Sequence, residues 1–413
     1  MLSNGLSQIA PDHIFEVTAL YNRDPNPNKA NLGQGTYKTN EGKPFVFPAV
    51  QTAKERLLNS YHEYLPILGY PAFREEAKKL VFGEDAAAVK ENRVATSQAL
   101  SGTGSLHLAG SFLRRVCSST TTVHITNPTW SNHRAVFETV GFPVKSYEYL
   151  DSAGRFDFSS LLTALQNAHS GDIFILHAVA HNPSGCDPSP SQWSQIRSIM
   201  QAKQLFPLLD AAYLGLTSGD FDADAWAIRH FASHGMEIAV CVSFAKNMGL
   251  YSERAGALHF VTTSEAEVRV VESHLEWLIR SEISNPPAFG ARVAAEVLGD
   301  EALRGSWKED LRGMTLRLKA MRARLVEELK RLGCPKNFDH VVEEAGMFTI
   351  LGLTRGEVHL LRDEYSIYMA DSSRISVAGL NEGNVVYIAE AINAICSATR
   401  QPQAAGQQIT PSL

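Results

Sequence analysis

The stretch Ser243-Phe-Ala-Lys-Asn-Met-Gly-Leu-Tyr-Ser-Glu-Arg-Ala-Gly256 follows the apolar run Ile238-Ala-Val-Cys-Val242, which is typical of a buried strand. Lys246 therefore comes just after a strand and among small and apolar neighbours, where desolvation lowers the pKa of an amine. A neutral amine can bond covalently to an aldehyde. Arg254 has the planar guanidinium that suits a phosphate, and Ser243 can hold another phosphate oxygen. An aldehyde and a phosphate on one small molecule describe pyridoxal 5'-phosphate (PLP).

The same residues allow a plainer interpretation, in which Lys246 is a solvated loop lysine and Arg254 a surface charge. Most lysines are exposed, so the two residues on their own favour this alternative. The ordered motif Ser-Phe-Ala-Lys-Asn-x-Gly-Leu-Tyr-x-Glu-Arg-x-Gly, however, resembles the cofactor-lysine segment of the aspartate aminotransferases, PLP enzymes of fold type I. The resemblance extends from about Pro11 to about Ser397. It implies that Lys246 holds PLP covalently and acts as the general acid–base.

The composition of the 413 residues argues against several classes of protein. Charged residues make up 20% and hydrophobic residues 44%, as in ordinary globular proteins, and the length suffices for more than one lobe. The net charge of −6 leaves no basic surface for nucleic acid. No apolar run approaches the roughly 20 residues of a membrane span. The five cysteines are scattered without a CxxC pair, so we expect free thiols in a reducing compartment.

The two ends of the sequence show no clear targeting signal. The segment Met1–Gln8 lacks a signal peptide and the Arg-rich leader of a mitochondrial protein, so we expect a cytoplasmic protein. The Gln/Ala/Pro-rich tail after Arg400 is expected to be disordered. Its last residues, Pro-Ser-Leu, lack the basic residue of the peroxisomal Ser-Lys-Leu address, so a peroxisomal location is not expected.

A glycine-rich segment, Ser101-Gly-Thr-Gly-Ser105, opens an amphipathic helix that we expect to continue through Arg114. The backbone N–H groups and the dipole at such a helix end favour an anion. An ordinary helix cap explains the segment equally well, and no Walker motif follows it. The resemblance implies that Ser101, Gly102 and Thr103 bind the cofactor phosphate together with Arg254 and Ser243.

An acid follows the apolar run Leu205-Phe-Pro-Leu-Leu209, and a buried carboxylate is costly unless a cation faces it. The protonated pyridine nitrogen of PLP would be the cation that faces this acid, Asp210. The motif Asp-x-Ala-Tyr resembles the family motif in which the tyrosine, here Tyr213, hydrogen-bonds the phenolic oxygen of the cofactor. The resemblance gives Asn182, in Ala180-His-Asn-Pro-Ser-Gly185, the same partner.

The segment Asn127-Pro-Thr-Trp-Ser-Asn-His133 follows a run that we expect to form a strand. A tryptophan in such a place is usually a core residue and a single histidine is usually structural. The family motif Pro-Thr-Trp-x-Asn-His implies instead that Trp130 stacks on the pyridine ring and contacts substrate. It also implies that His133 hydrogen-bonds Asp210 from behind. No metal site is expected.

Two arginines and a glycine are expected to bind the substrate. By resemblance, Arg374 in Asp371-Ser-Ser-Arg-Ile-Ser-Val377 clamps the α-carboxylate, and Arg280 holds the distal carboxylate of a dicarboxylic substrate. Asn182 and Gly35 are further substrate contacts, and the two glycines of Asn31-Leu-Gly-Gln-Gly35 indicate a close backbone approach. A plain turn remains the alternative at Gly35.

The resemblance also implies a homodimer whose sites are shared. A tyrosine in the segment His62-Glu-Tyr-Leu-Pro-Ile-Leu-Gly-Tyr70 reaches the cofactor phosphate of the neighbouring subunit in the family. We expect Tyr64 to be this residue, and Tyr70 is the rival candidate. On composition alone, Tyr64 is better explained as a packed aromatic residue.

The predicted fold is α/β. Strands alternate with helices from about Thr121 to Phe260, which indicates a mostly parallel sheet covered by helices on both faces. By resemblance we expect the fold type I arrangement. A large PLP-binding domain with a seven-stranded sheet spans residues 48–310, and a smaller α+β domain is built from residues 1–47 and 311–413. The segment from Pro11 to Phe47 is expected to be loop-like, because Asp24-Pro-Asn-Pro-Asn breaks any periodicity.

These motifs predict an aspartate aminotransferase-like enzyme that moves an amino group between aspartate or glutamate and 2-oxoglutarate or oxaloacetate by a ping-pong mechanism. The catalytic residues are expected to be Lys246, Asp210, Tyr213 and Trp130. Two positions near the site depart from the family, Leu214 for the usual Gln and Ile283 for a common Trp or Tyr, and they loosen the choice of substrate. An aromatic or specialised amino donor, a PLP lyase and a non-catalytic binding protein remain as alternatives. The complete cofactor set argues against the last of these.

Overall fold

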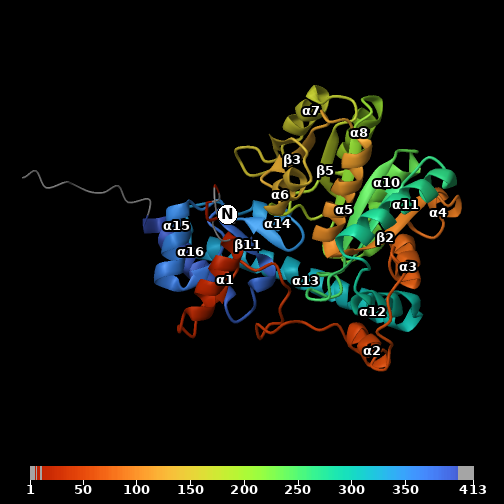
Figure 1. Ribbon diagram of the computed structural model, residues 1–413. Helices are drawn as coiled ribbons and strands as arrows, with labels where there is room; N and C mark the ends of the chain where they lie inside the picture. The colour runs from red at the N-terminus through yellow and green to blue at the C-terminus, as the bar shows by residue number, and fades with distance from the viewer. Residues whose placement is uncertain (1–4, 6, 10–11, 399–413) are drawn as a thin grey trace, which may run out of the picture. The chain divides into compact units, whose positions relative to one another are not determined.

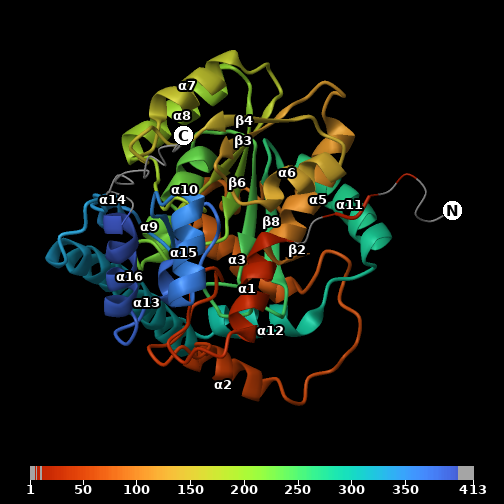
Figure 2. The same cartoon turned by 90° about the vertical axis from the view of Figure 1, so that its left-hand side faces the viewer.

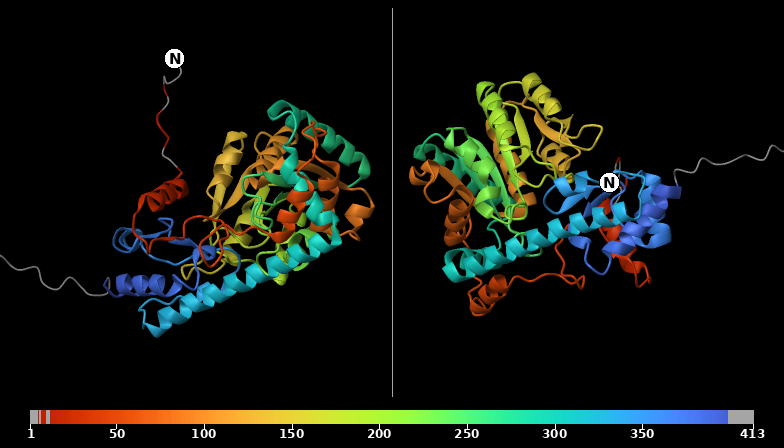
Figure 3. Two further views of the ribbon diagram at one scale, coloured as in Figure 1. Left: turned by 90° about the horizontal axis from the view of Figure 1, so that it is seen from below. Right: turned by 180° about the vertical axis from the view of Figure 1, so that it is seen from behind.

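The computed structural model describes residues 5, 7–9 and 12–398, which form two compact units. The large unit consists of Pro44–Leu318 and Glu344–Phe348, and the small unit of Met1–Lys43, Lys319–Glu343 and Thr349–Leu413. The expected tail lies outside the described residues. The division falls at residues 44 and 318 where the sequence analysis placed it at 48 and 310. It falls inside α13 (Glu301–Arg331), a single long helix that supplies residues to both units (Figure 3).

A seven-stranded sheet forms the centre of the large unit, as predicted (Figure 1). Its strand order is β2-β8-β7-β6-β5-β3-β4, and β8 alone runs antiparallel to its neighbours. The strands are β2 (Val94–Leu100), β3 (Val123–Asn127), β4 (Val144–Glu148), β5 (Ile173–His177), β6 (Phe206–Ala211), β7 (Ile238–Ser243) and β8 (Ala255–Val261). Every residue of β5, β7 and β8 is buried, which explains why these strands are continuous apolar runs rather than alternating ones.

Helices cover both faces of this sheet. Figure 2 shows the strands between α7, α8 and α10 on one side and α5, α6 and α11 on the other. These helices are α5 (Ser101–Val116), α6 (Asn132–Thr139), α7 (Phe158–Asn167), α8 (Pro190–Ala202), α10 (Trp226–Ser233) and α11 (Glu265–Glu282). Helices α5 and α11 pack on each other and on the strands, with Leu106, Leu275 and Ile279 buried in the core between them. Burial of these apolar stripes is the main stabilisation of the large unit.

The remaining helices of the large unit pack around one end of the sheet. They are α2 (Pro48–Arg56), α3 (Pro71–Phe82), α4 (Ala87–Lys90), α9 (Phe221–Asp224) and α12 (Ala288–Gly299). Pro48 and Pro71 begin their helices, where the missing N–H of proline has no cost. Helix α12 packs against both α2 and α3.

The small unit corrects one expectation. The segment that was predicted to be loop-like contains α1 (His13–Arg23), capped by Asp12, whose carboxylate accepts hydrogen bonds from the N–H groups of Ile14 and Phe15. The unit also contains β1 (Ala30–Asn31), α14 (His340–Glu343), α15 (Arg355–Tyr365), β10 (Ile367–Tyr368), β11 (Arg374–Ser376) and α16 (Val385–Ala398). Strand β1 pairs with β10, and β11 pairs with β9 (Phe348–Ile350).

Two further expectations concern the whole described chain. All five cysteines are free, as predicted. None of the helices in the described part of the chain combines the length and the hydropathy that crossing a membrane requires.

Candidate active site

Ten of the predicted site residues line one cavity at the carboxyl edge of the sheet in the large unit. This edge is where ligands bind in open α/β sheets, because the loops after neighbouring parallel strands meet there. The antiparallel strand β8 begins at the same edge, which brings Arg254 to the residues that follow β6 and β7. The cavity is lined by Ser101, Gly102, Thr103, Leu106, Trp130, His177, Asn182, Asp210, Ala212, Tyr213, Ser243, Ala245, Lys246 and Arg254.

Lys246 is half-buried in this cavity, and its ammonium nitrogen lies 5.1 Å from the centre of the Tyr213 ring. Desolvation lowers the pKa of its amine, and the positive charge of Arg254 lowers this pKa further, while the carboxylate of Asp210 opposes both effects. The plainer interpretation of Lys246 as a solvated loop lysine is therefore wrong. In this position a larger fraction of the amine is neutral, and therefore nucleophilic, than in water.

The turn that carries Lys246 is fixed through the next residue. The backbone carbonyl of Asn247 accepts a hydrogen bond of 2.6 Å from the indole N–H of Trp307, which is fully buried on α13. The Asn247 side chain donates to the carbonyl of Leu214 at 3.2 Å. Because Asn247 is itself fully buried, these bonds hold the backbone on one side of the lysine in a single position.

Asp210 is buried at the end of β6 and contacts His133, as predicted. Its Oδ2 lies 3.1 Å from Nε2 of His133, whose Nδ1 lies 2.7 Å from the hydroxyl of Thr129. Burial alone would raise the pKa of Asp210, but the hydrogen bond with His133 and the charges of His133, His177 and Lys246 keep this pKa below its ordinary value. The other carboxylate oxygen, Oδ1, is buried and has no hydrogen-bond partner in the described structure. A buried, charged and unpaired oxygen is costly unless a ligand faces it.

His177 was not predicted as a site residue, although it lines the cavity. It is buried at the end of β5, its ring lies 5.0 Å from that of His133, and neither of its nitrogens has a hydrogen-bond partner within the described residues. Burial lowers its pKa to about 3, so the ring is neutral. One atom each of His133, His177 and Asp210 could approach a common ion, but the lone carboxylate oxygen also suits an organic cation. In the sequence, His177 is one residue of an apolar run, and nothing there distinguishes it from a core residue.

Tyr213 and Asn182 meet on the other side of the cavity. The side-chain amide of Asn182 donates to the phenolic oxygen of Tyr213 at 3.3 Å, and both residues are buried. Trp130 is partly exposed, and its ring meets that of His133 edge-on at 5.4 Å. The three side chains therefore line a cavity that Asp210 and Lys246 also reach.

A group of small and polar residues lies where α5 begins. The hydroxyls of Ser101 and Ser243 are 2.8 Å apart and buried. Ser101 and Arg254 have positive φ angles of 58° and 54°, a region that residues other than glycine rarely adopt. Strain of this kind often occurs at binding sites, and here it accompanies a helix N-terminus that can receive an anion.

Gly256 lets its own backbone lie close to the backbone of Ser101 and Val242. A Cβ at position 256 would lie 2.5 Å from Cα of Ser101 and 2.7 Å from the carbonyl oxygen of Val242. We expect Gly256→Ala to lower the free energy of unfolding by about 1–3 kcal/mol, since backbone atoms on both sides would have to move. The matched control is Gly313→Ala on α13, where a new Cβ meets nothing within 4 Å, and alanine there should stabilise the helix. Denaturant unfolding of both variants measures the difference. Equal free energies of unfolding for the two variants would show that the close packing at Ser101 does not require glycine at position 256.

Three predicted residues of the large unit lie outside the cavity lining. Tyr64 is 82% exposed. Tyr70 packs near Arg292, and its N–H donates to Gln98. Arg280 is exposed at the end of α11 and donates to the hydroxyl of Ser284 at 2.5 Å.

The two predicted residues of the small unit lie near each other within that unit. Arg374 donates to the carbonyl of Gly33 at 2.6 Å, two residues before Gly35. The N–H of Ser376 donates to Leu32 at 2.6 Å, so β11 is fastened along the glycine-containing segment. The guanidinium of Arg374 is thus held beside a backbone that has little side-chain bulk.

The two departures from the family motif do not line the cavity. Leu214 is fully buried, and its contact with the lysine turn is the carbonyl that accepts from Asn247. Ile283 is 38% exposed and caps the end of α11 near Arg280. A different side chain at Leu214 can therefore affect the site only by moving the backbone carbonyl that Asn247 binds. Ile283 places an apolar surface beside the exposed Arg280.

Comparison with known proteins identifies close relatives of this chain. Residues 27–392 match the family model for aminotransferases of class I and II. The chain is 47% identical to the cytoplasmic aspartate aminotransferase of Oryza sativa subsp. japonica, over 94% of this chain and 97% of the relative. It is 45% identical to the chloroplastic aspartate aminotransferase 3 of Arabidopsis thaliana, over 94% of this chain and 88% of the relative. A solved aromatic-amino-acid aminotransferase from Burkholderia pseudomallei, covalently bound to pyridoxal phosphate, is 39% identical with a TM-score of 0.93, over 96% of this chain and 100% of that chain.

Proposed function

Because this chain belongs to the family of class I and II aminotransferases, we propose that it is a PLP-dependent aspartate aminotransferase. It moves the amino group of aspartate or glutamate to a 2-oxo acid, 2-oxoglutarate or oxaloacetate, in two half-reactions. The observation that carries the proposal is the meeting of Lys246, the unpaired carboxylate oxygen of Asp210 and the serine-lined helix end in one cavity.

The residues present fit PLP by their chemistry. The helix N-terminus with Ser101, Ser243 and Arg254 suits a phosphate, and the free oxygen of Asp210 suits a protonated ring nitrogen. An amine of lowered pKa, Lys246, suits the aldehyde. When bound, PLP supplies an electron sink for the charge that develops at the α-carbon of the substrate.

Lys246 performs the acid–base step in this proposal. Its Nζ accepts the proton from the α-carbon of the amino acid and later returns a proton, as a general base and then a general acid. The fixed turn at Asn247 limits the positions that the amine can occupy, which reduces the entropy cost of the transfer. The lowered pKa of the amine brings it closer to the operating pH of a cell.

Asp210 provides a fixed negative charge for the ring nitrogen. His133 and Thr129 orient the carboxylate from behind, so that Oδ1 is left for the ligand. Tyr213 and Asn182 would donate to the phenolic oxygen of PLP, and Trp130 would stack on the PLP ring. Gly102 and Thr103 complete the phosphate site beside Ser101.

Arg374 and Arg280 bind the two carboxylates of the substrate, and Gly35 and Asn182 contribute further contacts. Arginine presents a planar pair of N–H groups that a carboxylate can accept from in two parallel bonds. A substrate with an apolar side chain would leave one of these guanidinium groups without its anion.

We expect the enzyme to prefer aspartate and glutamate over phenylalanine and leucine by roughly ten- to a hundredfold in kcat/KM. A charge-assisted hydrogen bond contributes about 1.5–3 kcal/mol, and about 1.4 kcal/mol corresponds to a tenfold change. Steady-state kcat/KM values for the four donors with 2-oxoglutarate, with the oxo acid products identified, test both this preference and the proposed reaction. Phenylalanine or leucine ahead of aspartate would overturn the substrate while leaving the cofactor chemistry in place.

An aromatic amino donor is the second candidate. It is favoured by the likeness to the aromatic-amino-acid aminotransferase of Burkholderia pseudomallei and by the apolar surface of Ile283 beside Arg280. The Arg280→Leu variant tests whether this arginine serves the dicarboxylic donors alone. Loss of activity toward aspartate with unchanged activity toward phenylalanine supports the proposed role of Arg280, and equal loss for both donors contradicts it.

The active unit in this proposal is a homodimer with shared sites. Tyr64 and Arg280 lie outside the cavity of their own chain, and both are exposed. They belong to neighbouring segments, because the side chain of Asn285 donates to the carbonyl of Leu65 at 2.7 Å. A single surface of the large unit therefore presents a tyrosine and an arginine to a second copy of the chain, where they reach the phosphate and the distal carboxylate.

Mixing two inactive variants should restore activity if the sites are shared. In a hybrid of an Arg280→Ala chain with a Lys246→Ala chain, one site has both an intact lysine and an intact arginine. Equal mixing should recover about a quarter of the wild-type activity at low aspartate, since about half of the dimers are hybrids with one whole site each. Mass spectrometry of intact dimers verifies that subunits have exchanged. Exchange without recovery would show that each chain uses its own arginine.

The compartment is proposed to be the cytoplasm. The support is the 47% identity to a cytoplasmic enzyme, while a chloroplastic relative is 45% identical. Fractionation of cells that express the full chain with a small epitope tag decides between these compartments.

A further inference from the structure

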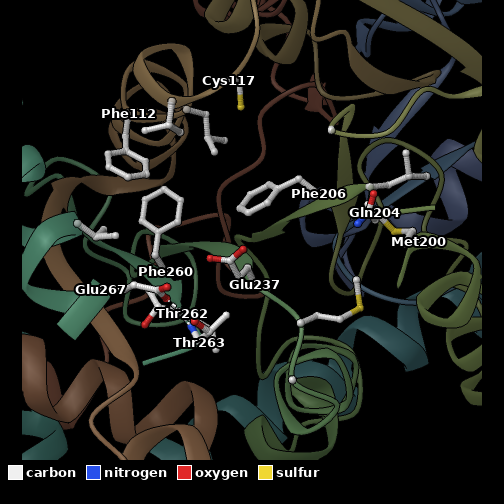
Figure 4. A pocket seen from close by; sticks show the side chains of 18 of the residues that line it. Phe112, Cys117, Met200, Gln204, Phe206, Glu237, Phe260, Thr262, Thr263 and Glu267 are labelled. Atoms are coloured by element: carbon white, nitrogen blue, oxygen red, sulfur yellow. Dashed lines mark hydrogen bonds between the residues drawn. The ribbon is translucent and has the colours of Figure 1, made fainter. Parts of the chain in front are cut away.

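A second cavity, of about 700 Å³, opens in the large unit away from the candidate active site (Figure 4). Pockets for small molecules typically have volumes of about 300–1,000 Å³, so this one can hold a whole organic ligand. Nothing in the proposed aminotransferase reaction uses it.

The cavity lies at the amino edge of the parallel strands. Phe206 begins β6 here, whereas Asp210 reaches the active site near the end of that strand. Helix α5 begins with Ser101 in the active site, and its last turns, around Phe112, line the second cavity. The two cavities are thus at opposite ends of the same strands and helix, and a molecule in the second one cannot be the substrate undergoing reaction.

Three phenylalanine rings, those of Phe112, Phe206 and Phe260, line part of the cavity among mostly aliphatic side chains. The rings of Phe112 and Phe260 lie 4.8 Å apart at an angle of 53°. In Figure 4 the rings of Phe206 and Phe260 and the carboxylate of Glu237 all point into the same open space. The faces of aromatic rings carry partial negative charge, so this wall attracts cations as well as apolar groups.

The charged side chains that line the cavity are two glutamates. The lining residues include Glu237 and Glu267 and contain no lysine, arginine or histidine. The carboxylate of Glu267 accepts from the N–H and the hydroxyl of Thr263 at 2.9 and 2.6 Å, and these bonds lower its pKa and keep it ionised. Glu237 has no side-chain hydrogen bond or ion pair within the described residues. Desolvation, and then the charge of Glu267, raise its pKa.

We propose that this cavity binds a small organic cation, with an apolar, aromatic body against the phenylalanine rings and an ammonium group at Glu237 and Glu267. The charges decide the sign of the ligand. A cation reduces the repulsion between the two exposed carboxylates, whereas an anion adds to it. Dicarboxylic substrates and phosphates are therefore excluded from this site.

The probe is benzyltrimethylammonium, titrated calorimetrically into the full-length protein loaded with its cofactor. A quaternary nitrogen cannot bond to an aldehyde, so any heat cannot come from reaction with PLP. We expect saturable one-site binding with a dissociation constant in the millimolar range or tighter. Neopentylbenzene, which has the same shape without the charge, should bind at least about tenfold more weakly, because cation–π and carboxylate contacts are lost.

Three variants assign the binding to this cavity. Glu237→Gln keeps the shape of the side chain at an exposed position and should weaken binding by about two- to fivefold, as expected for the loss of an exposed charge pair. Val270→Trp fills the cavity from a residue that is 57% exposed, and it should abolish binding. Glu276→Gln, on the exposed surface of the same α11 but outside the cavity, is the matched control and should bind as the wild type does.

The proposal is overturned by any of three results. They are no saturable binding of the probe up to about 10 mM, equal affinity of the wild type and Glu237→Gln, or equal affinity for the probe and the hydrocarbon. Binding that is weakened in Glu237→Gln and unchanged in Glu276→Gln supports it. None of these results depends on the proposed transaminase activity, which is measured separately with aspartate and 2-oxoglutarate.

Discussion

Replacement of Lys246 by alanine should lower kcat/KM for aspartate by about 10⁴-fold, because a positioned general acid–base contributes up to about four orders of magnitude. Desolvation lowers the pKa of this amine, and the turn that carries it is fixed through Asn247. The variant should keep its fold, since alanine removes a half-buried charge and leaves both hydrogen bonds of Asn247 in place. Stopped-time assays of 2-oxo acid formation at high enzyme concentration measure the loss.

The control for this variant is Lys319→Ala, which removes an exposed lysine from α13. Its activity should match the wild type within a factor of about two, as expected for a surface substitution. A Lys246→Ala protein that retains more than about a hundredth of the wild-type kcat/KM would show that another group transfers the proton.

Replacement of Asp210 by asparagine should lower kcat by about 10²- to 10⁴-fold. Breaking a buried charge pair costs about 3–5 kcal/mol, and each 1.36 kcal/mol in the barrier is about tenfold in rate. Asparagine preserves the shape and can still meet His133, so the change removes the charge that faces the ring nitrogen and little else. The Asp210→Glu variant keeps the charge and should retain more activity than Asp210→Asn. Steady-state kinetics of both variants with aspartate measures these losses.

A second buried acid provides the matched control. Asp224 is buried and accepts hydrogen bonds from the N–H groups of Gly215, Thr217 and Ser218, so its role is to hold a loop. Asp224→Asn should lower the free energy of unfolding and leave kcat nearly unchanged. If Asp210→Asn instead loses stability and keeps its rate, the carboxylate is a structural residue and the assignment of the ring nitrogen partner is wrong.

Much of the large unit could be predicted because its strands are continuous apolar runs that end at polar residues. The runs before Asp210 and Lys246 indicate buried parallel strands, and parallel strands bring their carboxyl ends to one edge. In the sequence, both residues are assigned to one site because each resembles a family motif that binds the same cofactor. The strained backbone at Ser101 and Arg254 leaves no comparable signal in the sequence.

Other features depend on contacts between distant residues. In the sequence, Trp307 is an apolar residue of a long helix, and its bond to Asn247 follows only from the tertiary packing. His177 ends the apolar run of β5, and such a run predicts a buried strand rather than a site residue. Glu237 and Glu267 line one cavity because the start of β7 and the start of α11 meet at one edge.

Helix α1 was missed for a different reason. The turn residues from Asp24 to Asn28 predict a loop, but they follow the helix rather than interrupt it. Asp12 is a recognisable N-cap, and the stretch from His13 to Arg23 contains neither proline nor glycine. These two features are the sequence signals of the helix.

The most direct test of the central claim is the location of the cofactor bond. The purified protein is reduced with borohydride in the presence of PLP, digested, and analysed by mass spectrometry for the peptide that carries the phosphopyridoxyl group. The account predicts that the group is on Lys246 and that it is absent from the Lys246→Ala protein. A phosphopyridoxyl group on another lysine of the wild-type protein, with Lys246 unmodified, would contradict it.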